Sequence, residues 1–517
     1  MARDGTDTWI LPEGLRPDML LAALASAFGI QTFPEYAAEV VYTDSFDWRL
    51  FQDGFLLHCH NRSWTLYHGD GGEVTVQQDG PELGGRCFGR DFPPGPLRDL
   101  LIPVLGARAL LPMARVHLIG RQVRLLNNDE KTVARLVFER QQPSAGTEVF
   151  SLVRLFGLRG FDQELDTVRC LLRENGVTRP ASPLVGFEEA CRSAGRRPLD
   201  YSSKFTVRLE PSWTAREAMV HIYRQLLAII SRNLSGTIDD LDPEFLHDLR
   251  VAIRRTRSGL SLAKDVLPVE VVVTARRDFA ALGAITGPTR DLDVYLENRE
   301  LYLERLPEVL RLGLTGFFAD LAARRQTEQH RMARELRAKK TKTILTAWKH
   351  HLNVKEPSQA LRADVPVIEL AGRIIHRRSK RVLRDGRALH AATPDEDVHR
   401  LRIQCKKLRY ALEFFGSLYP EDEMALLVRQ LKRLQDIIGD FNDLTVQQRL
   451  LATALAGMGK ASRADLGRAA ALGALMQNLY QEQQALRDHL SEVFARFADP
   501  DTVHLYRSLF RPGEEPA

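Results

Sequence analysis

The sequence predicts an α+β protein, in which a mainly antiparallel β domain is followed by an all-α domain of two pseudo-symmetric helical bundles. Up to about residue 205, apolar and polar side chains alternate in short runs separated by turn residues, a pattern typical of β-strands. From Thr214 onward, long segments of helical periodicity dominate. Within them one motif occurs twice, with His399 following His247 at an offset of 152 residues, which indicates an internal duplication.

The composition is typical of a globular protein in a reducing compartment. The chain has 517 residues, 44% of them apolar and 27% charged, which suits roughly two to four domains with ample core. Its 5 cysteines are scattered and do not form the pattern of a disulfide framework. The N-terminus lacks the order of a signal peptide, and its longest apolar run, Met19–Ile30, is shorter than the ~20 residues that cross a bilayer. We therefore expect a cytoplasmic protein with no membrane partner.

The N-terminal half is expected to combine hairpins with flanking helices. We predict strands within 55–67, 73–77, 116–126 and 133–138, and helices over Asp18–Phe28 and Asp162–Glu174. Proline, glycine and serine then accumulate between about 176 and 214. We place the domains at 1–205 and 215–510 with a linker at 206–214, and divide the helical domain into repeat one (215–365) and repeat two (366–510).

Each repeat is expected to contain a helix that carries a buried apolar stripe. His247–Leu260 aligns without gaps on His399–Leu412. Asp242–Pro243–Glu244 predicts the start of the first helix, and Thr393–Pro394–Asp395–Glu396 predicts a capping box at the start of the second. Glycine and proline further along, at Gly287–Pro288 and its counterpart Gly439, are expected to separate helices.

A cationic stripe lies beside each apolar stripe. Its residues follow the spacing i, i+3, i+7, i+10, which places them on one helical face. Solvated faces usually mix both signs of charge, whereas we expect these stripes to lack carboxylate partners. The stripes comprise His247, Arg250, Arg254 and Arg257 in repeat one and His399, Arg402, Lys406 and Arg409 in repeat two, with Arg255 and Lys407 beside them.

Other basic segments strengthen the positive charge of the helical half. One predicted helix carries Arg373, Arg377, Lys380 and Arg384 on a shared face, and another basic segment runs from His330 to Lys342, where a solvated helix face is the favoured interpretation. Residues 1–210 hold 24 basic and 27 acidic side chains, whereas residues 211–517 hold 48 and 40. This surplus predicts an anionic partner.

The chemistry of these side chains suits phosphate oxygens, to which arginine, lysine and histidine can all donate. A trough lined by such faces fits a repeating polyanion, either inorganic polyphosphate or a nucleic acid. Nucleic-acid binding usually adds aromatic platforms for the bases, and Tyr410 is the only aromatic residue among the stripes. Polyphosphate is therefore favoured. For the histidines, the alternative is a neutral ring packed near a helix start.

Four motifs, in order, resemble the CHAD family of histidine-containing α-helical domains. They are Phe245–Leu260, Gly287–Val294, Val398–Tyr410 and Leu434–Asp443. The resemblance covers about 215–510 and implies two four-helix units whose basic surface binds inorganic polyphosphate, with association to polyphosphate granules. By motif position it carries binding onto the eight stripe residues. Asn442 departs from the pattern, since Arg290 stands at the equivalent position of repeat one.

Residues 1–205 resemble a CYTH, or triphosphate-tunnel, domain. Val41–Leu50 is similar to that family's Tyr-x-Asp segment, and Ser203–Lys204 to its terminal Ser-Lys. The family's opening Glu-x-Glu-x-Lys strand would fall near Thr8–Pro12, which has no acids, and its later glutamate pair near Thr147–Leu152, which has Glu148 alone. A divalent metal needs clustered carboxylates. We therefore expect a degenerate CYTH-like domain without triphosphatase activity.

No cofactor, metal site or catalytic residue is expected, and the sequence does not predict the oligomeric state. His58–Cys59–His60 lacks metal-site spacing, because strand alternation puts Cys59 on the opposite face from both histidines. Asp291 and Asp293 are expected to cap a helix rather than bind metal. Two alternatives to a polyphosphate-binding protein remain: a triphosphate hydrolase in the N-terminal domain assisted by the helical domain, and a general nucleic-acid or polyanion binder.

Overall fold

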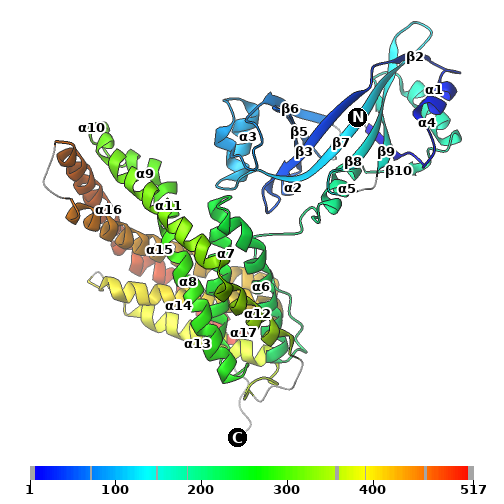
Figure 1. Cartoon of the computed structure of the whole chain (residues 1–517). Helices are drawn as coiled ribbons and strands as arrows, with labels where there is room; N and C mark the ends of the chain where they lie inside the picture. Colours follow the sequence, from blue (N-terminus) through cyan, green and yellow to red (C-terminus); the bar gives the residue numbers. More distant parts are fainter. Residues whose placement is uncertain are drawn as a thin grey trace. The chain divides into compact units, whose positions relative to one another are not determined.

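The chain divides into two compact units, Met1–Lys204 and Phe205–Ala517 (Figure 1). The computed structural model describes residues 6–69, 73–146, 149–182, 184–354, 360–390, 392–458 and 463–510. The first unit is built on an antiparallel sheet and the second is helical, which confirms the predicted fold class. Within the described ranges, no helix is both long and apolar enough to cross a bilayer.

The first unit is a ten-stranded antiparallel sheet in the order β10-β1-β9-β8-β7-β3-β4-β5-β6, with β2 paired to β7. Its strands are β1 (Thr6–Ile10), β2 (Gly29–Thr32), β3 (Tyr36–Asp44), β4 (Phe55–His60), β5 (Ser63–His68), β6 (Glu73–Asp79), β7 (Leu111–Leu126), β8 (Thr132–Pro143), β9 (Phe150–Gly157) and β10 (Arg179–Pro180). Its helices are α1 (Pro17–Leu24), α2 (Arg49–Gln52), η1 (Gly89–Asp91), α3 (Pro96–Leu105), α4 (Asp162–Glu174) and α5 (Val185–Ser193). Every predicted strand and helix of this half is present, although residues 55–67 form two strands, because Asn61 adopts a φ of 56° and turns the chain between them.

The two faces of the sheet differ in polarity. One face is apolar and is covered by α1 and α4 at one end and by α3 at the other. The opposite face carries Tyr42, His58, Glu139 and Arg154, and α5 packs on it through Phe187, whose ring lies edge-on to Tyr42 at 5.2 Å. The apolar core of this unit therefore lies mainly on one side of the sheet.

The second unit consists of helices whose order repeats. Repeat one contains α6 (Ala215–Ile238), α7 (Pro243–Leu262), α8 (Val269–Glu297), α9 (Arg299–Glu304), α10 (Glu308–Arg311), η2 (Leu312–Leu314), α11 (Thr315–Arg337) and α12 (Lys339–Asn353). Repeat two contains α13 (Val367–Arg387), α14 (Asp395–Phe415), η3 (Gly416–Leu418), α15 (Glu421–Ala456), α16 (Arg463–Phe497) and α17 (Pro500–Leu509). Within this unit, Figure 1 shows the long helices α15 and α16 running side by side.

The two repeats are joined symmetrically where each begins. Thr214 and Pro366 form an isolated antiparallel bridge. Ala215 N donates to Val365 O at 2.8 Å, and Val367 N donates to Trp213 O at 2.9 Å. Each bond maps onto the other by the same 152-residue offset. The starts of α6 and α13 are thus held in pseudo-two-fold positions, and α7 and α14 pack against each other beside them.

The predicted breaks at Gly287–Pro288 and Gly439 are wrong, because both positions lie inside continuous helices, α8 and α15. Proline removes one backbone donor from a helix. The guanidinium of Arg250 on α7 donates to Gly283 O of α8 at 3.2 Å, which ties this part of α8 to α7. Tertiary packing on α7 therefore overrides the local signal.

Three further expectations need correction. Thr393 does not cap α14, since its hydroxyl accepts from His390 N at 2.8 Å, whereas Asp242 does cap α7. The basic segment 330–342 is divided between α11 and α12 at Ala338. Residues 206–214 belong to the helical unit, because Val207 and Leu209 are only 5% and 4% exposed in its core.

Candidate functional site

A cleft between the two repeats gathers the cationic side chains. Arg254 Nε on α7 donates to the Tyr410 hydroxyl on α14 at 2.7 Å and so joins the two stripe-bearing helices. The adjoining cleft has a volume of about 600 Å³. Its lining residues include six cations, Arg254, Arg257, Arg276, Arg277, Lys406 and Lys407, and no carboxylate among the described residues. The arrangement can therefore bind anions through several forks and ammonium groups at once.

The structure brings together some predicted site residues and uses others to hold α8 and α15 in place. Arg254, Arg257, Lys406 and Lys407 line the cleft. Arg250 instead donates to α8, to Gly283 O at 3.2 Å and Thr286 Oγ1 at 3.3 Å. Its counterpart Arg402 pairs with Asp443 on α15 at 3.2 Å.

The prediction that the stripes lack carboxylate partners is wrong for several members. Glu413 accepts from Arg255 at 2.8 Å and from Arg409 at 2.8 Å. Glu413 lies four residues after Arg409 on the same helix, a spacing at which side chains meet. Arg402 is paired as well, through Asp443 of the neighbouring helix. The unpaired charge does not extend along both stripes. Even at the cleft, Arg277 pairs with Asp278 at 3.0 Å, and the cations without a salt bridge among the described residues are Arg254, Arg257, Arg276, Lys406 and Lys407.

The two histidines are held differently. Burial, opposed by Glu244, lowers the pKa of His247, so that its neutral form is favoured in the empty protein. His399 Nδ1 lies 2.6 Å from Asn442 Oδ1. At the position equivalent to Asn442, Arg290 pairs with Glu297 at 3.0 Å. The sequence difference between Arg290 and Asn442 thus gives the two repeats different surroundings for their histidines.

Burial and like charges act together on Lys406 in the cleft. Desolvation, together with the neighbouring cations Arg402 and Arg254, lowers the pKa of Lys406 to about 8, while Asp443 opposes them. Arg254 and Arg257 have no salt-bridge partner among the described residues. A cation that is partly desolvated and faces other cations is poorly stabilised by the protein itself. An anion bound in the cleft would supply the missing negative charge and stabilise the cation.

Gly283 leaves room for Arg257 beside the cleft. A Cβ atom at this position would lie 3.3 Å from Arg257 Nη1. The equivalent residue in repeat two is Gln435, whose Oε1 accepts from Arg409 Nη1 at 3.4 Å. Gly283 thus leaves the guanidinium of Arg257 available for a ligand. Gln435, at the equivalent position, engages that of Arg409.

Helix α13 contributes cations that the predicted face did not include. Of the predicted residues, Arg373 pairs with Glu369 at 3.4 Å and Arg384 with Asp385 at 2.7 Å, whereas Arg377 and Lys380 are exposed. Missed members of the wider cationic group are Arg276 and Arg277 on α8 and Arg378 and Arg381 on α13. The adjacent Arg276–Arg277 and Arg377–Arg378 pairs were the available sequence signals. Their proximity depends on the packing between helices.

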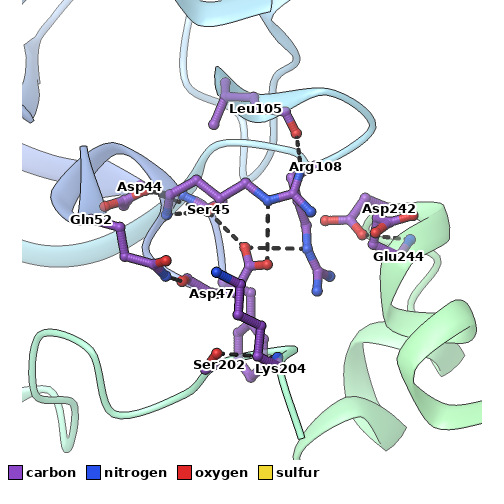
Figure 2. A network of polar contacts seen from close by, with 12 residues as sticks. Asp44, Ser45, Asp47, Gln52, Leu105, Arg108, Ser202, Lys204, Asp242 and Glu244 are labelled. Carbon is purple, nitrogen blue, oxygen red and sulfur yellow. Dashed lines mark hydrogen bonds and ion pairs between the residues drawn. The ribbon is translucent and has the colours of Figure 1, made fainter. Parts of the chain in front are cut away.

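In the sheet unit, Asp44 and Asp47 of the segment 41–50 belong to a network of polar contacts (Figure 2). Asp44 accepts hydrogen bonds from the backbone N–H groups of Ser45, Leu50 and Phe51 at 2.6, 3.0 and 3.0 Å. Burial nevertheless raises its pKa to about 7. Asp47 lies 3.3 Å from Arg108, and although burial opposes its ionisation, Arg108 and Arg49 lower its pKa overall. Both carboxylates therefore serve the local fold.

The polar face of the sheet holds Glu139 paired with Arg154 at 3.2 Å, and Gln141 donates to the same carboxylate at 2.7 Å. Burial lowers the pKa of His58 nearby to about 4. Glu148 lies outside the described residues. Throughout the part of the chain that is described, no three His, Cys, Asp or Glu side chains cluster in a way that could hold a metal ion. Asp293 does not cap a helix as expected, since it lies within α8 and pairs with Arg325 at 2.7 Å.

Comparison with known proteins identifies the helical region. Residues 221–452 match the family model of the CHAD domain. Two curated relatives, both uncharacterized proteins of Mycobacterium tuberculosis, are 25% identical over 215 residues, which is 41% of this chain and 40% of each relative. The chain thus matches less than half the length of these relatives.

Three solved structures are similar over part of the chain. The CHAD domain from the plant Ricinus communis is 25% identical, with a TM-score of 0.42 over 61% of this chain and 98% of its own. PptA from Streptomyces chartreusis is 17% identical, with a TM-score of 0.45 over 55% of this chain and 99% of its own. A putative adenylyl cyclase from Hippeastrum, described as having a dominant triphosphatase activity, is 13% identical, with a TM-score of 0.25 over 38% of this chain and 98% of its own.

Proposed function

Since the chain carries a CHAD domain at residues 221–452, we propose that it binds inorganic polyphosphate, without catalysis, in the cleft between α7 and α14. One observation supports this most directly: six cations and no carboxylate line that cleft within the described residues. The proposal includes a cytoplasmic protein associated with polyphosphate granules, as the family resemblance implies.

The electrostatics of the cleft favour a ligand of high charge density. Lys406 is held partly out of water beside other cations, which lowers its pKa. Each phosphate that enters replaces repulsion with charge-assisted hydrogen bonds and releases counterions into the solvent. A flexible chain of phosphates can follow the cations with little steric demand, which matches a cleft lined mainly by long basic side chains.

The aromatic residue at the cleft does not suit a nucleic-acid base. Tyr410 is 7% exposed, its hydroxyl accepts from Arg254, and its ring stacks on Phe414 at a centroid distance of 6.4 Å. A base platform needs an accessible ring face. This supports polyphosphate over DNA or RNA as the preferred polyanion.

The test replaces two cations of the cleft that form no salt bridge among the described residues. We expect the Arg254→Ala/Lys406→Ala variant to bind long-chain polyphosphate at least about tenfold more weakly by calorimetry at fixed salt, because two charge-assisted contacts are lost. Arg250 and Arg402 are kept, since they hold α8 and α15. The Lys406→Ala single variant, which keeps the hydrogen bond between Arg254 and Tyr410, should melt at a higher temperature than the wild type without ligand, because repulsion is relieved.

The control removes the same charge elsewhere. Lys339→Ala/Lys342→Ala changes two exposed lysines on α12 and should leave the affinity within about twofold. Equal weakening by both double variants would show that only net charge matters. Duplex DNA that displaces polyphosphate at equal phosphate concentration would favour the general polyanion binder instead.

A further inference from the structure

The pseudo-two-fold relation between the repeats assigns each residue near the cleft a counterpart at an offset of 152. Arg254 corresponds to Lys406, Arg257 to Arg409 and Arg255 to Lys407. Charge is therefore duplicated on the two sides of the α7–α14 contact. The carboxylate is not, because Glu413 corresponds to Ser261.

On one side, Glu413 neutralises the cations. It receives Arg255 through two nitrogens, Nε at 3.0 Å and Nη2 at 2.8 Å, and Arg409 Nε at 2.8 Å. The guanidinium of Arg255 also lies over the ring of Phe205, 4.9 Å from its centroid. Arg255 and Glu413 are only 14% and 16% exposed. These donors are already engaged, and an incoming anion would have to displace Glu413.

On the other side, Ser261 leaves the equivalent cations without a carboxylate. Ser261, Arg257 and Lys407 all line the cleft. Burial, together with the positive charges of Arg378, Arg381 and Arg276, lowers the pKa of Lys407. No salt bridge to Lys407 is present among the described residues. Four cations from three helices are thus close enough to repel one another.

Arg378 indicates that this side is built for an anion. Its side chain is 5% exposed, and its Nε has no hydrogen-bond partner within the described part of the chain. Its Nη1 donates to the neutral Gln404 Oε1 at 3.4 Å. A buried guanidinium without a counter-ion is unfavourable unless a ligand supplies the charge.

Most of the additional cations lie on this side, although Lys432 on α15 stands in place of Ala280, which lines the cleft. The positions equivalent to Arg377, Arg378 and Arg381 on α6 are Gln225, Leu226 and Ile229, and Val428 on α15 stands in place of Arg276. Glu413 and the cations of α13 break the pseudo-symmetry in the same direction, whereas Asp278, which pairs with Arg277 at 3.0 Å and has Gln430 as its counterpart, opposes them. The replacement of Glu413 by Ser261 and the cations of α13 each favour anions on the Ser261 side.

We propose that a polyphosphate chain occupies the Ser261 side only, running from Arg254 and Lys406 past Lys407 toward Arg378 and Arg381, while Glu413 closes the equivalent path. This rests on the proposed function and specifies the path within it. One domain then takes one phosphate chain on one path. Ser261 and Glu413 act as the residues that select the side.

The first test introduces the closing carboxylate on the open side. Ser261→Glu should weaken the binding of long-chain polyphosphate at least about tenfold, because the new carboxylate can pair with Arg257 and Lys407. Ser261→Gln adds similar volume without charge and should stay within about threefold of the wild type. If Ser261→Glu binds as the wild type does, the path does not run past Ser261, and the proposal fails.

A second test compares two arginines at equivalent positions of the two repeats. Arg277 lines the open cleft, and its counterpart Arg429 lies exposed on α15. Arg277→Ala should lower affinity about threefold or more, whereas Arg429→Ala should leave it unchanged. Equal losses in both variants would overturn the one-sided path and leave polyphosphate binding intact. Absence of binding by the wild type would instead refute the proposed function.

Discussion

At the scale of single residues, Lys406 makes ligand binding in the cleft depend on pH. Burial first, and then Arg402 and Arg254, lower its pKa from 10.5 to about 8. Bound phosphates favour the charged ammonium, so binding above about pH 8 should take up close to one proton, and affinity should fall between about pH 8 and pH 10. Calorimetry in two buffers of different ionisation enthalpy measures this proton uptake.

The stability of the ligand-free protein depends on pH in the opposite direction from the affinity for polyphosphate. Because the folded protein lowers the pKa of Lys406, the unfolded chain binds more protons between about pH 8 and the unfolded pKa of 10.5. Its contribution therefore makes the ligand-free protein more stable as the pH rises through this window. Lys406→Arg keeps the charge at all these pH values and should remove the proton uptake. If the arginine variant still takes up a proton, another group is responsible.

Single residues also show where sequence reasoning ends. The spacing of the stripes correctly placed Arg254, Arg257 and Lys406 on the helices that form the cleft. The partner of Arg255 is 158 residues away, on α14, and only helix packing brings Glu413 to it. Glu413 as the i+4 partner of Arg409 could have been read from the sequence.

At the scale of elements, Gly283 on α8 controls the space that Arg257 occupies. Gly283→Gln should raise the free energy of unfolding by roughly 0.5–1 kcal/mol, since glycine disfavours a helix interior. It should also weaken polyphosphate binding by about threefold or more, because the new amide can engage Arg257 as Gln435 engages Arg409. Thermal unfolding and calorimetry on the same sample measure both effects.

The matched control is Gly473→Gln on α16, an exposed helical glycine whose added Cβ would meet no atom within 4 Å. It should give a similar gain in stability without loss of affinity. Weakened binding in this control would mean that helix stabilisation in general reduces binding. If Gly283→Gln instead binds normally, Arg257 does not need its present position to contact the ligand.

The presence of helices and strands was predicted more accurately than the residues at which they begin and end. Hydrophobic periodicity identified α4 and α7 because one face of each is buried. The break predicted from glycine and proline at Gly287–Pro288 is wrong, because α8 continues through both residues. Glycine and proline report backbone preference, and tertiary packing can override that preference.

At the scale of the whole molecule, each unit has a core of its own. The cleft draws its lining only from residues 254–410. We therefore expect a fragment of residues 205–517 to bind long-chain polyphosphate within about twofold of the full chain. Loss of binding in a fragment that still unfolds cooperatively would assign part of the site to the sheet unit.

The same fragment tests where the helical unit begins. Punctuating residues predicted a linker at 206–214, but Val207 and Leu209 are buried in the helical core, and Leu209 N donates to Ser417 Oγ at 3.0 Å. Burying two such side chains stabilises a fold by about 3–6 kcal/mol at most. A fragment of residues 215–517 should therefore melt at a clearly lower temperature than 205–517. If the two fragments melt alike, the segment contributes nothing to stability and behaves as the linker that the sequence predicts.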